Sequence, residues 1–310
     1  MNVSNDVSKF LGGEANLFAT SDWAGMYQEG ILPIAIGNDA AAKAILNVFV
    51  YKRLGKSVVI NPPFAPNSGL SIAINSAKRY SIHSDVKRVM RTLAKYLQKE
   101  FGGAYIDIAF PPEVKDIQPF IQSGFTPEIG YTYRLNLAPN EKELLNGFSS
   151  ERRKNVRDAE KNNLKVELNT NPDEVIALIS DTLTRSGLKY DFGILRGMIG
   201  ADWTFTVSIR NASQLLATSV IAFDNHCAYY IAGGTLKDLG NTGAGAYALW
   251  KSIEESKKRN IPQFDFCGSS VPSIESFFRG FGGELTPFFR VKNNFMLFDL
   301  LKSTKEKISS

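Results

Sequence analysis

The chain is poor in cysteine and histidine, with two of each among 310 residues. Cys227 and Cys267 both lie in apolar, strand-like segments, so we expect reduced core residues and neither a disulfide nor a nucleophile. His83 and His226 are far apart and belong to no Cys/His cluster. No zinc motif is recognisable, and we expect no metal cofactor.

Long apolar runs are also missing. No stretch approaches the roughly 18 apolar residues of a membrane-spanning helix, and the first residues lack the basic and apolar regions of a secretory signal. We therefore expect a cytoplasmic protein. The net charge of +5 and the pI of 9.0 favour anionic partners, such as phosphate groups or an acidic membrane surface. The basic residues are not interleaved with stacking aromatics, so DNA is not an expected partner.

The sequence contains the same order of predicted elements twice. In each half, a helix is followed by a strand centred on an aspartate, a proline-containing turn, a short helix ending in Gly-Phe and an aromatic strand. Asp265 follows Asp107 by 158 residues, and Gly280 follows Gly124 by 156. Such constant spacing indicates an internal repeat.

We predict an α/β fold with mixed sheets, divided into an N-terminal domain of residues 1–137 and a C-terminal domain of residues 138–310. The length suits two domains of about 150 residues each. A hydrophobic content of 44% is enough for each domain to bury a core. The tail at 294–307 is typical of a closing amphipathic helix.

The two copies differ where a strand meets the repeated helix. In the second half this junction contains Gly233, Gly240, Gly243 and Gly245, among others. Glycines let the backbone approach an anion, and the N–H groups at a helix start point toward it, so a pyrophosphate-bearing donor is one expected ligand. A plain turn with a helix cap is the alternative. The matching segment of the first half, 72–85, has no glycine, so we expect that copy to have lost the donor site.

A second difference is a cationic helix at 149–163. Arg153, Arg157 and Lys161 recur every four residues, although like charges at this spacing cost a few tenths of a kcal/mol each. Arginine can bind a phosphate through two N–H groups. The stripe is therefore either an anion-binding surface or a solvated helix face.

Two further residues are candidates for chemistry. Asp265 stands between two phenylalanines in a predicted central strand, where a carboxylate is either a structural hydrogen-bond acceptor or a catalytic group. Arg279 precedes a glycine-rich turn, where its charge could polarise a carbonyl or hold a phosphate. An ordinary surface arginine is the alternative.

Four motifs of the second half carry a resemblance to a known family. Tyr-Tyr-Ile-Ala-Gly-Gly at 229–234, Gly-Ala-Gly-Ala-Tyr at 243–247, Phe-Asp-Phe-Cys-Gly at 264–268 and Phe-Arg-Gly-Phe-Gly-Gly-Glu-Leu at 278–285 resemble the Fem-type branch of the GNAT acyltransferases. The likeness covers nearly the whole chain and includes Ser-Asp-Trp at 21–23. That branch has tandem GNAT folds and includes the aminoacyl-tRNA-dependent enzymes that build peptidoglycan interpeptide bridges.

The resemblance implies transfer of an acyl group from acyl-CoA or aminoacyl-tRNA to an amine of a cell-envelope precursor or sugar. A lipid-linked acceptor and peripheral contact with the inner membrane face are implied as well. The expected donor-binding residues are Tyr230, Ile231, Ala232, Gly243 and Gly245. The expected catalytic residues are Arg279, Tyr247 and Asp265. The expected acceptor-binding residues, in a cleft between the domains, are Trp23, Arg153 and Arg157.

The chain departs from the family pattern in two places. Bridge-forming members usually carry lysine before the Gly-Phe-Gly turn, whereas Arg279 stays protonated and cannot act as a base. Gly240 stands where the GNAT pyrophosphate signature normally has Gln or Arg. The helical-hairpin insertion of some tRNA-using members is absent. A non-catalytic binder of a phosphorylated envelope lipid or sugar, and a small-amine N-acetyltransferase, therefore stay open as alternatives.

Overall fold

The computed structural model describes residues 1–293 except for 7, 9, 11–14, 39–40, 75, 186–190, 238–239, 241 and 269–270. The chain forms two compact units. Unit 1 combines Met1–Gly130 with Pro287–Ser310, and unit 2 is Tyr131–Thr286. This division differs from the boundary at 137/138 drawn from the sequence. The closing helix expected at 294–307 lies outside the described residues.

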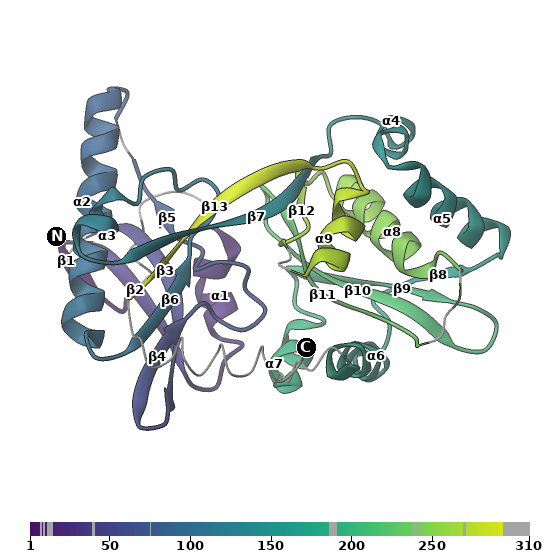
Figure 1. Ribbon diagram of the computed structural model, residues 1–310, viewed down its shortest axis with the longest axis horizontal. Helices are drawn as coiled ribbons and strands as arrows, with labels where there is room; N and C mark the ends of the chain where they lie inside the picture. Colours follow the sequence, from purple (N-terminus) through teal and green to yellow (C-terminus); the bar gives the residue numbers. More distant parts are fainter. Residues whose placement is uncertain are drawn as a thin grey trace. The chain divides into compact units, whose positions relative to one another are not determined.

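Unit 1 contains a mixed sheet (Figure 1). Its strands lie in the order β1 (Asn2–Ser4), β2 (Ile31–Asn38), β3 (Ala41–Arg53), β4 (Lys56–Ile60), β6 (Tyr105–Ala109) and β13 (Glu284–Lys292), with β5 (Ser71–Ile72) paired to β3. Neighbouring strands are antiparallel except for β4 and β6, which run parallel.

Helices cover the apolar side of this sheet. The helix α2 (Arg79–Phe101) packs on β1 and β2 and against α3 (Gln118–Gln122). Its buried residues Met90, Leu93 and Leu97 recur at helical spacing, which explains why this segment forms an amphipathic helix. The short α1 (Ser21–Ala24) is capped by the Thr20 hydroxyl, which accepts the backbone N–H of Trp23.

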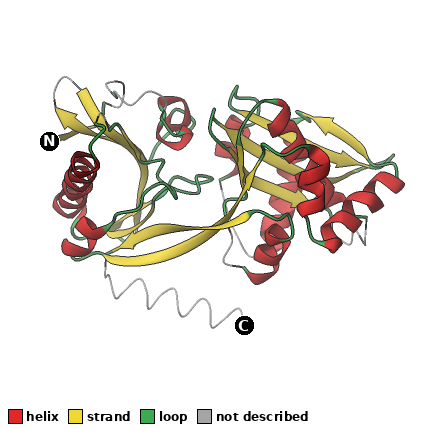
Figure 2. Ribbon diagram, turned by 90° about the horizontal axis from the view of Figure 1, so that it is seen from above, coloured by secondary structure: helices red, strands yellow, loops and turns green. Residues whose placement is uncertain are grey.

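The sheet strands of unit 2 are also mixed in direction, and helices cover both of their faces (Figures 1 and 2). Its strands lie in the order β7 (Thr126–Asn136), β12 (Gln263–Asp265), β11 (Ala228–Thr235), β10 (Leu215–Phe223), β9 (Thr204–Arg210) and β8 (Lys165–Leu168). Its helices are α4 (Glu141–Gly147), α5 (Ser150–Lys161), α6 (Pro172–Arg185), α7 (Phe192–Met198), α8 (Ala244–Lys258) and α9 (Pro272–Arg279). The helix α8 packs on β9 and β10, and α6 packs on β10 and β11.

The two copies of the repeat exchange their last strands. In sequence, β7 follows α2 and β6, yet it pairs with β12 of the second copy, where Arg134 lies opposite Asp265. The reverse holds for β13, which ends the second copy and pairs with β6 of the first, where Val291 lies opposite Ile108. Each sheet is therefore completed by a strand that belongs in sequence to the other copy.

An arginine–aspartate pair joins each exchanged strand to its neighbour. In unit 2, Arg134 Nε lies 2.7 Å from Asp265 Oδ2, and the two side chains are 9% and 5% exposed. In unit 1, Arg290 Nη2 donates to both oxygens of Asp107 at 2.7 and 2.8 Å, and the arginine side chain is 38% exposed. The pair in unit 2 is therefore the more completely removed from water.

This difference in burial predicts unequal costs for the same substitution. Asp265→Asn leaves a buried guanidinium without its counter-charge and is expected to lower the free energy of unfolding by about 3 kcal/mol. Asp107→Asn leaves a partly solvated guanidinium and is expected to cost about 1 kcal/mol. Urea unfolding, with hydrogen exchange read at the amides of β12 and β6, measures both. Equal costs for the two variants would contradict this view of the pairs.

Candidate active site

A β-bulge interrupts β11 in unit 2. Val220 of β10 lies opposite Ala232, and the next residue, Ile221, lies opposite Tyr230, so Ile231 is the extra residue on β11. A bulge bends its strand and leaves the extra residue outside the regular ladder. The bulge falls within the predicted donor-binding residues Tyr230, Ile231 and Ala232.

The same stretch of β11 leaves its parallel neighbour. Within the described residues, β11 pairs with β12 only at Ala228–Phe264 and Tyr229–Asp265, although β11 continues to Thr235. The ladder stops there because β12 ends at Asp265. We refer to the stretch of this edge of β11 from Tyr230 to Thr235, which has no paired strand beside it among the described residues, as the gap. Backbone N–H groups at such a gap are oriented by the sheet and can bind a developing oxyanion.

The thiol of Cys267 lies at the start of this gap. It donates weakly to the Asp265 carbonyl at 3.6 Å, and the Tyr230 backbone N–H bonds to the sulfur. Burial, helped by the Asp265 charge, raises the pKa of Cys267 well above its usual value. The residue is thus a neutral thiol and a poor nucleophile, which agrees with the interpretation made from its sequence context.

Tyr230 forms one wall of the gap. Its ring packs against Phe278 of α9, with centroids 5.6 Å apart, and burial raises its pKa, so the phenol is neutral. A Cβ on Gly233 would lie 1.8 Å from the Tyr230 hydroxyl. Gly233 is therefore explained by the packing of Tyr230, and it needs no ligand to account for it.

Gly243 also has a packing explanation. It precedes α8 with φ +76, and a Cβ there would lie 2.0 Å from the carbonyl oxygen of Asn155 in α5. Only glycine fits this left-handed conformation with α5 so close. Gly245 is less constrained, because its Cβ would meet the Thr235 methyl at 3.1 Å. The binding of donor phosphates by Gly243 and Gly245 stays a prediction.

Tyr247 faces a different part of unit 2. The Lys251 ammonium lies 5.1 Å from the centre of its ring, and the other charges acting on it are Glu160 and Glu254. Burial raises the Tyr247 pKa, and Lys251 partly opposes this. These neighbours belong to α5 and α8, so the structure does not bring Tyr247 together with the gap.

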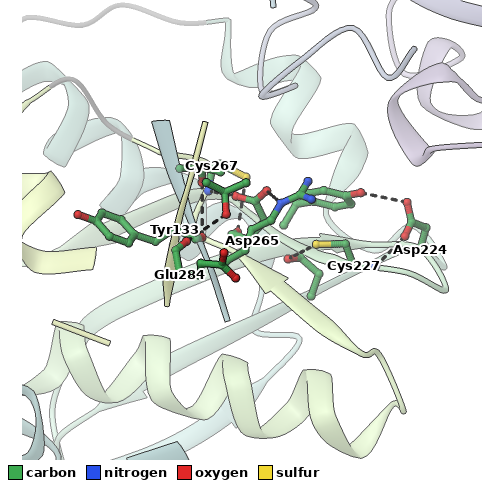
Figure 3. Close-up of polar contacts among 11 residues, drawn as sticks. Tyr133, Asp224, Cys227, Asp265, Cys267 and Glu284 are labelled. Carbon is green, nitrogen blue, oxygen red and sulfur yellow. Dashed lines mark hydrogen bonds and ion pairs between the residues drawn. The ribbon is translucent and has the colours of Figure 1, made fainter. Parts of the chain in front are cut away.

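Both oxygens of the Asp265 carboxylate accept hydrogen bonds from neighbouring groups of unit 2. Oδ1 accepts the Thr132 hydroxyl at 2.5 Å and the Cys267 backbone N–H at 2.7 Å, and Oδ2 accepts Arg134 Nε. Figure 3 shows Asp265 with dashed polar contacts to its neighbours, and Cys267 close to it. The geometry favours a structural carboxylate over a catalytic one.

Arg279 ends α9 and is 62% exposed, with its Nε 3.4 Å from Glu275 Oε1. The same oxygen accepts the Tyr133 hydroxyl at 2.5 Å. This hydrogen bond, with burial, raises the Tyr133 pKa. Neither Tyr133 nor Glu275 is among the site residues predicted from the sequence. The spacing of Glu275 and Arg279, four residues apart on a helix, was the one available signal.

The three predicted acceptor-binding residues are not brought together by any described contact. Trp23 is wholly buried in unit 1, edge-on against Phe18 at 4.7 Å. Arg153 donates to the Asn146 carbonyl at 3.1 Å and to the Phe148 carbonyl, so it caps the end of α4. Arg157 is exposed on α5. Trp23 and Arg153 thus have evident structural roles, and acceptor binding by all three stays a prediction.

Solved structures share this fold. FemX is similar with a TM-score of 0.66 and 14% identity over 93% of this chain and 97% of that chain. The C-terminal domain of a putative lysylphosphatidylglycerol synthetase from Agrobacterium fabrum is similar with a TM-score of 0.55 and 10% identity, over 84% of this chain and 85% of that chain. L-PGS from Bacillus licheniformis is similar with a TM-score of 0.51 and 11% identity, over 82% of each chain. The chain therefore has a Fem-type GNAT fold, which confirms the fold class and the resemblance drawn from the sequence.

Other comparisons add no family assignment. No protein-family model matches the chain, and no curated protein matches it in sequence. Among the described helices, none combines the length and apolar character needed to cross a bilayer. Within the same residues, no three His, Cys, Asp or Glu side chains gather closely enough to hold a metal ion.

Two glycines of the loop before α8, Gly243 and Gly240, provide a matched test of whether Gly243 is required by packing against α5. Gly243→Ala is expected to cost about 3 kcal/mol or more, because it combines an unfavourable φ with a clash against α5. Gly240→Ala has φ +59 but nothing within 4 Å of the new Cβ, so it should cost only about 1 kcal/mol. Thermal unfolding of the two variants measures this difference. A Gly243→Ala variant as stable as Gly240→Ala would contradict the packing explanation.

Proposed function

We propose that the chain is an N-acyltransferase that binds an acyl thioester or aminoacyl ester in the gap beside β11. The observation that supports this most directly is the bulge at Ile231 beside the point where β12 ends. It provides oriented backbone N–H groups in a buried setting, where hydrogen bonds to developing charge are strongest.

The donor lies along β11 in this proposal. Its reacting carbonyl oxygen accepts hydrogen bonds from the backbone N–H groups of Ile231 and Ala232. Its phosphates, or the terminal nucleotide of an aminoacyl-tRNA, lie toward the N-terminus of α8, where free N–H groups and the helix dipole favour negative charge. Gly240 leaves open space beside this end of the loop.

The transfer step needs no covalent enzyme intermediate. The neutral acceptor amine attacks the donor carbonyl, and a C–N bond forms as the carbonyl oxygen gains charge. Collapse breaks the C–S bond of a thioester or the C–O bond of an aminoacyl ester. The amine proton passes through water to the leaving thiolate or alkoxide. Cys267 takes no part, because its thiol is neutral and already hydrogen-bonded.

Arg279 is the cation that stabilises developing charge in this scheme. Its exposed guanidinium is oriented by Glu275, which is itself held by Tyr133. Asp265 has a structural role in this scheme: it holds β12 in position and takes no part in the chemical step. Tyr247, an expected catalytic residue, is assigned no step here because its neighbours lie on α5 and α8.

The proposed acceptor is an amine on a cell-envelope precursor or sugar, including a lipid-linked one, and the chain acts in the cytoplasm. FemX and the C-terminal domain of a putative lysylphosphatidylglycerol synthetase share the fold, and the latter name describes an aminoacyl group joined to a lipid. The basic pI of 9.0 suits an anionic acceptor or donor. The choice between acyl-CoA and aminoacyl-tRNA is left to the experiment.

Substitution of Arg279 tests its assigned role. Arg279→Ala is expected to lower turnover at least ten-fold, because it removes a charge used in the transition state. Its melting temperature should change little, since an exposed ion pair contributes between 0 and about 1 kcal/mol. Turnover is measured with acetyl-CoA and with aminoacyl-tRNA against amine acceptors, alongside thermal unfolding.

Arg196→Ala is the matched control, because Arg196, like Arg279, is more than half exposed and paired with a carboxylate, here that of Asp173. It should leave both turnover and melting temperature near those of the wild type. A parallel loss of turnover and stability in Arg279→Ala would make Arg279 structural. Calorimetry that shows a nucleotide-sugar binding, with no binding or turnover of either donor, would favour the non-catalytic binder instead.

A further inference from the structure

The hairpin of β3 and β4 projects from the body of unit 1 (Figure 1). Its ladder runs outward from Phe49–Ile60 to Arg53–Lys56, and the turn is Leu54-Gly55. Every residue from 51 to 56 is exposed. The end of the hairpin therefore offers both its backbone turn and its side chains to a partner.

Leu54 is an unexpected residue for this turn. It is 77% exposed, and both Leu54 and Gly55 have positive φ, at +50 and +75. A two-residue turn with this backbone favours Asn-Gly or Asp-Gly, since leucine is strained in the left-handed region. Leu54 is unfavourable for the turn and also exposes an apolar side chain to water. Folding alone gives no reason for it.

Cations surround this apolar tip. Lys52, Arg53 and Lys56 are exposed, and the sequence from 50 to 60 contains no acidic residue. Lys52 Nζ also lies 2.9 Å from the Ser57 hydroxyl. Tyr51 is 36% exposed and packs its ring against Phe49 at 6.1 Å. An apolar tip, an amphipathic aromatic and a cationic rim thus occur within one hairpin.

We infer that the tip of this hairpin docks on an anionic lipid bilayer. Leu54 enters the interfacial region, Tyr51 lies at the headgroup level where tyrosine is favoured, and the three cations meet lipid phosphates. The phosphates of an RNA would also bind the cations, but they offer no apolar surface for the exposed Leu54 side chain. Docking does not depend on transfer chemistry, yet it would hold the chain at a membrane that carries a lipid-linked acceptor.

Vesicle flotation with the full-length protein tests the docking. Vesicles of equal parts phosphatidylglycerol and phosphatidylcholine should bind the wild type, and vesicles of phosphatidylcholine alone should bind it far more weakly. Each cation near an anionic surface strengthens binding about five-fold, so replacing Lys52, Arg53 and Lys56 with serine should weaken it about 100-fold. About 1 M salt, with a Debye length of about 3 Å, should weaken wild-type binding similarly.

Leu54→Asn separates docking from folding. Asn-Gly is the preferred sequence for this turn, so the variant should fold at least as stably as the wild type. It should nevertheless bind the anionic vesicles about ten-fold more weakly, because the apolar contact is lost. The charge control replaces the exposed Lys142, Lys165 and Lys258 of unit 2 with serine, which removes the same net charge and should leave most binding intact.

Three results would overturn the inference. Leu54→Asn could bind anionic vesicles as tightly as the wild type, or the unit 2 control could lose as much binding as the hairpin triple variant. The triple variant could also lose affinity for tRNA while keeping its affinity for vesicles, which would make the hairpin an RNA contact. Because none of these readouts uses turnover, failure of docking is distinguishable from failure of the proposed transferase activity.

Discussion

The buried ion pair between Arg134 and Asp265 is the interaction on which the candidate site depends. The strand β12 is three residues long and pairs with β11 at two positions and with β7 at three. The Asp265 carboxylate fixes it by accepting the Arg134 guanidinium, the Thr132 hydroxyl and the Cys267 N–H. β12 is thus held from the side of β7, and its ladder with β11 ends at Asp265.

Buried ion pairs are rarely the most stabilising solution for a protein interior, because desolvation offsets much of the attraction. Each pair joins a closing strand to its neighbour: Arg134 to Asp265 and Arg290 to Asp107. Because both copies of the repeat contain this combination, the pairs alone do not decide which strand completes which sheet.

The gap beside β11 is lined mainly by neutral groups. Burial raises the pKa values of Tyr230 and Cys267, so both are uncharged, and Phe278 packs on the same side. The charges of Asp265 and Arg134 act on Cys267 from beside this lining, and in the proposal the backbone N–H groups near Ile231 bind the donor oxygen. Arg279 lies outside this lining, exposed and oriented by Glu275. This separation of neutral lining and external cation suits a reaction that develops negative charge on one oxygen.

Sequence periodicity and the repeat were enough to predict the mixed α/β fold, and the positions of Asp107 and Asp265 as equivalents. They could not reveal the strand exchange, because an aromatic strand has the same pattern whichever sheet it joins. The repeat did align Arg134 with Arg290, which was an unused signal. The bulge at Ile231 leaves no mark on period-two alternation. Gly243 was predicted to bind donor phosphates, because the sequence cannot show that the Asn155 carbonyl occupies the space that a Cβ at this position would need.

The central claim is that an acyl donor binds beside β11, in the stretch beyond the end of its ladder with β12. Amide chemical shifts of the ¹⁵N-labelled protein, titrated with acetyl-CoA and with a stable aminoacyl-adenosine analogue, test it most directly. The account predicts that one of these donors shifts the amides of Ile231, Ala232 and Gly245 together, with a single affinity. Shifts confined to unit 1, or none with either donor, would contradict it.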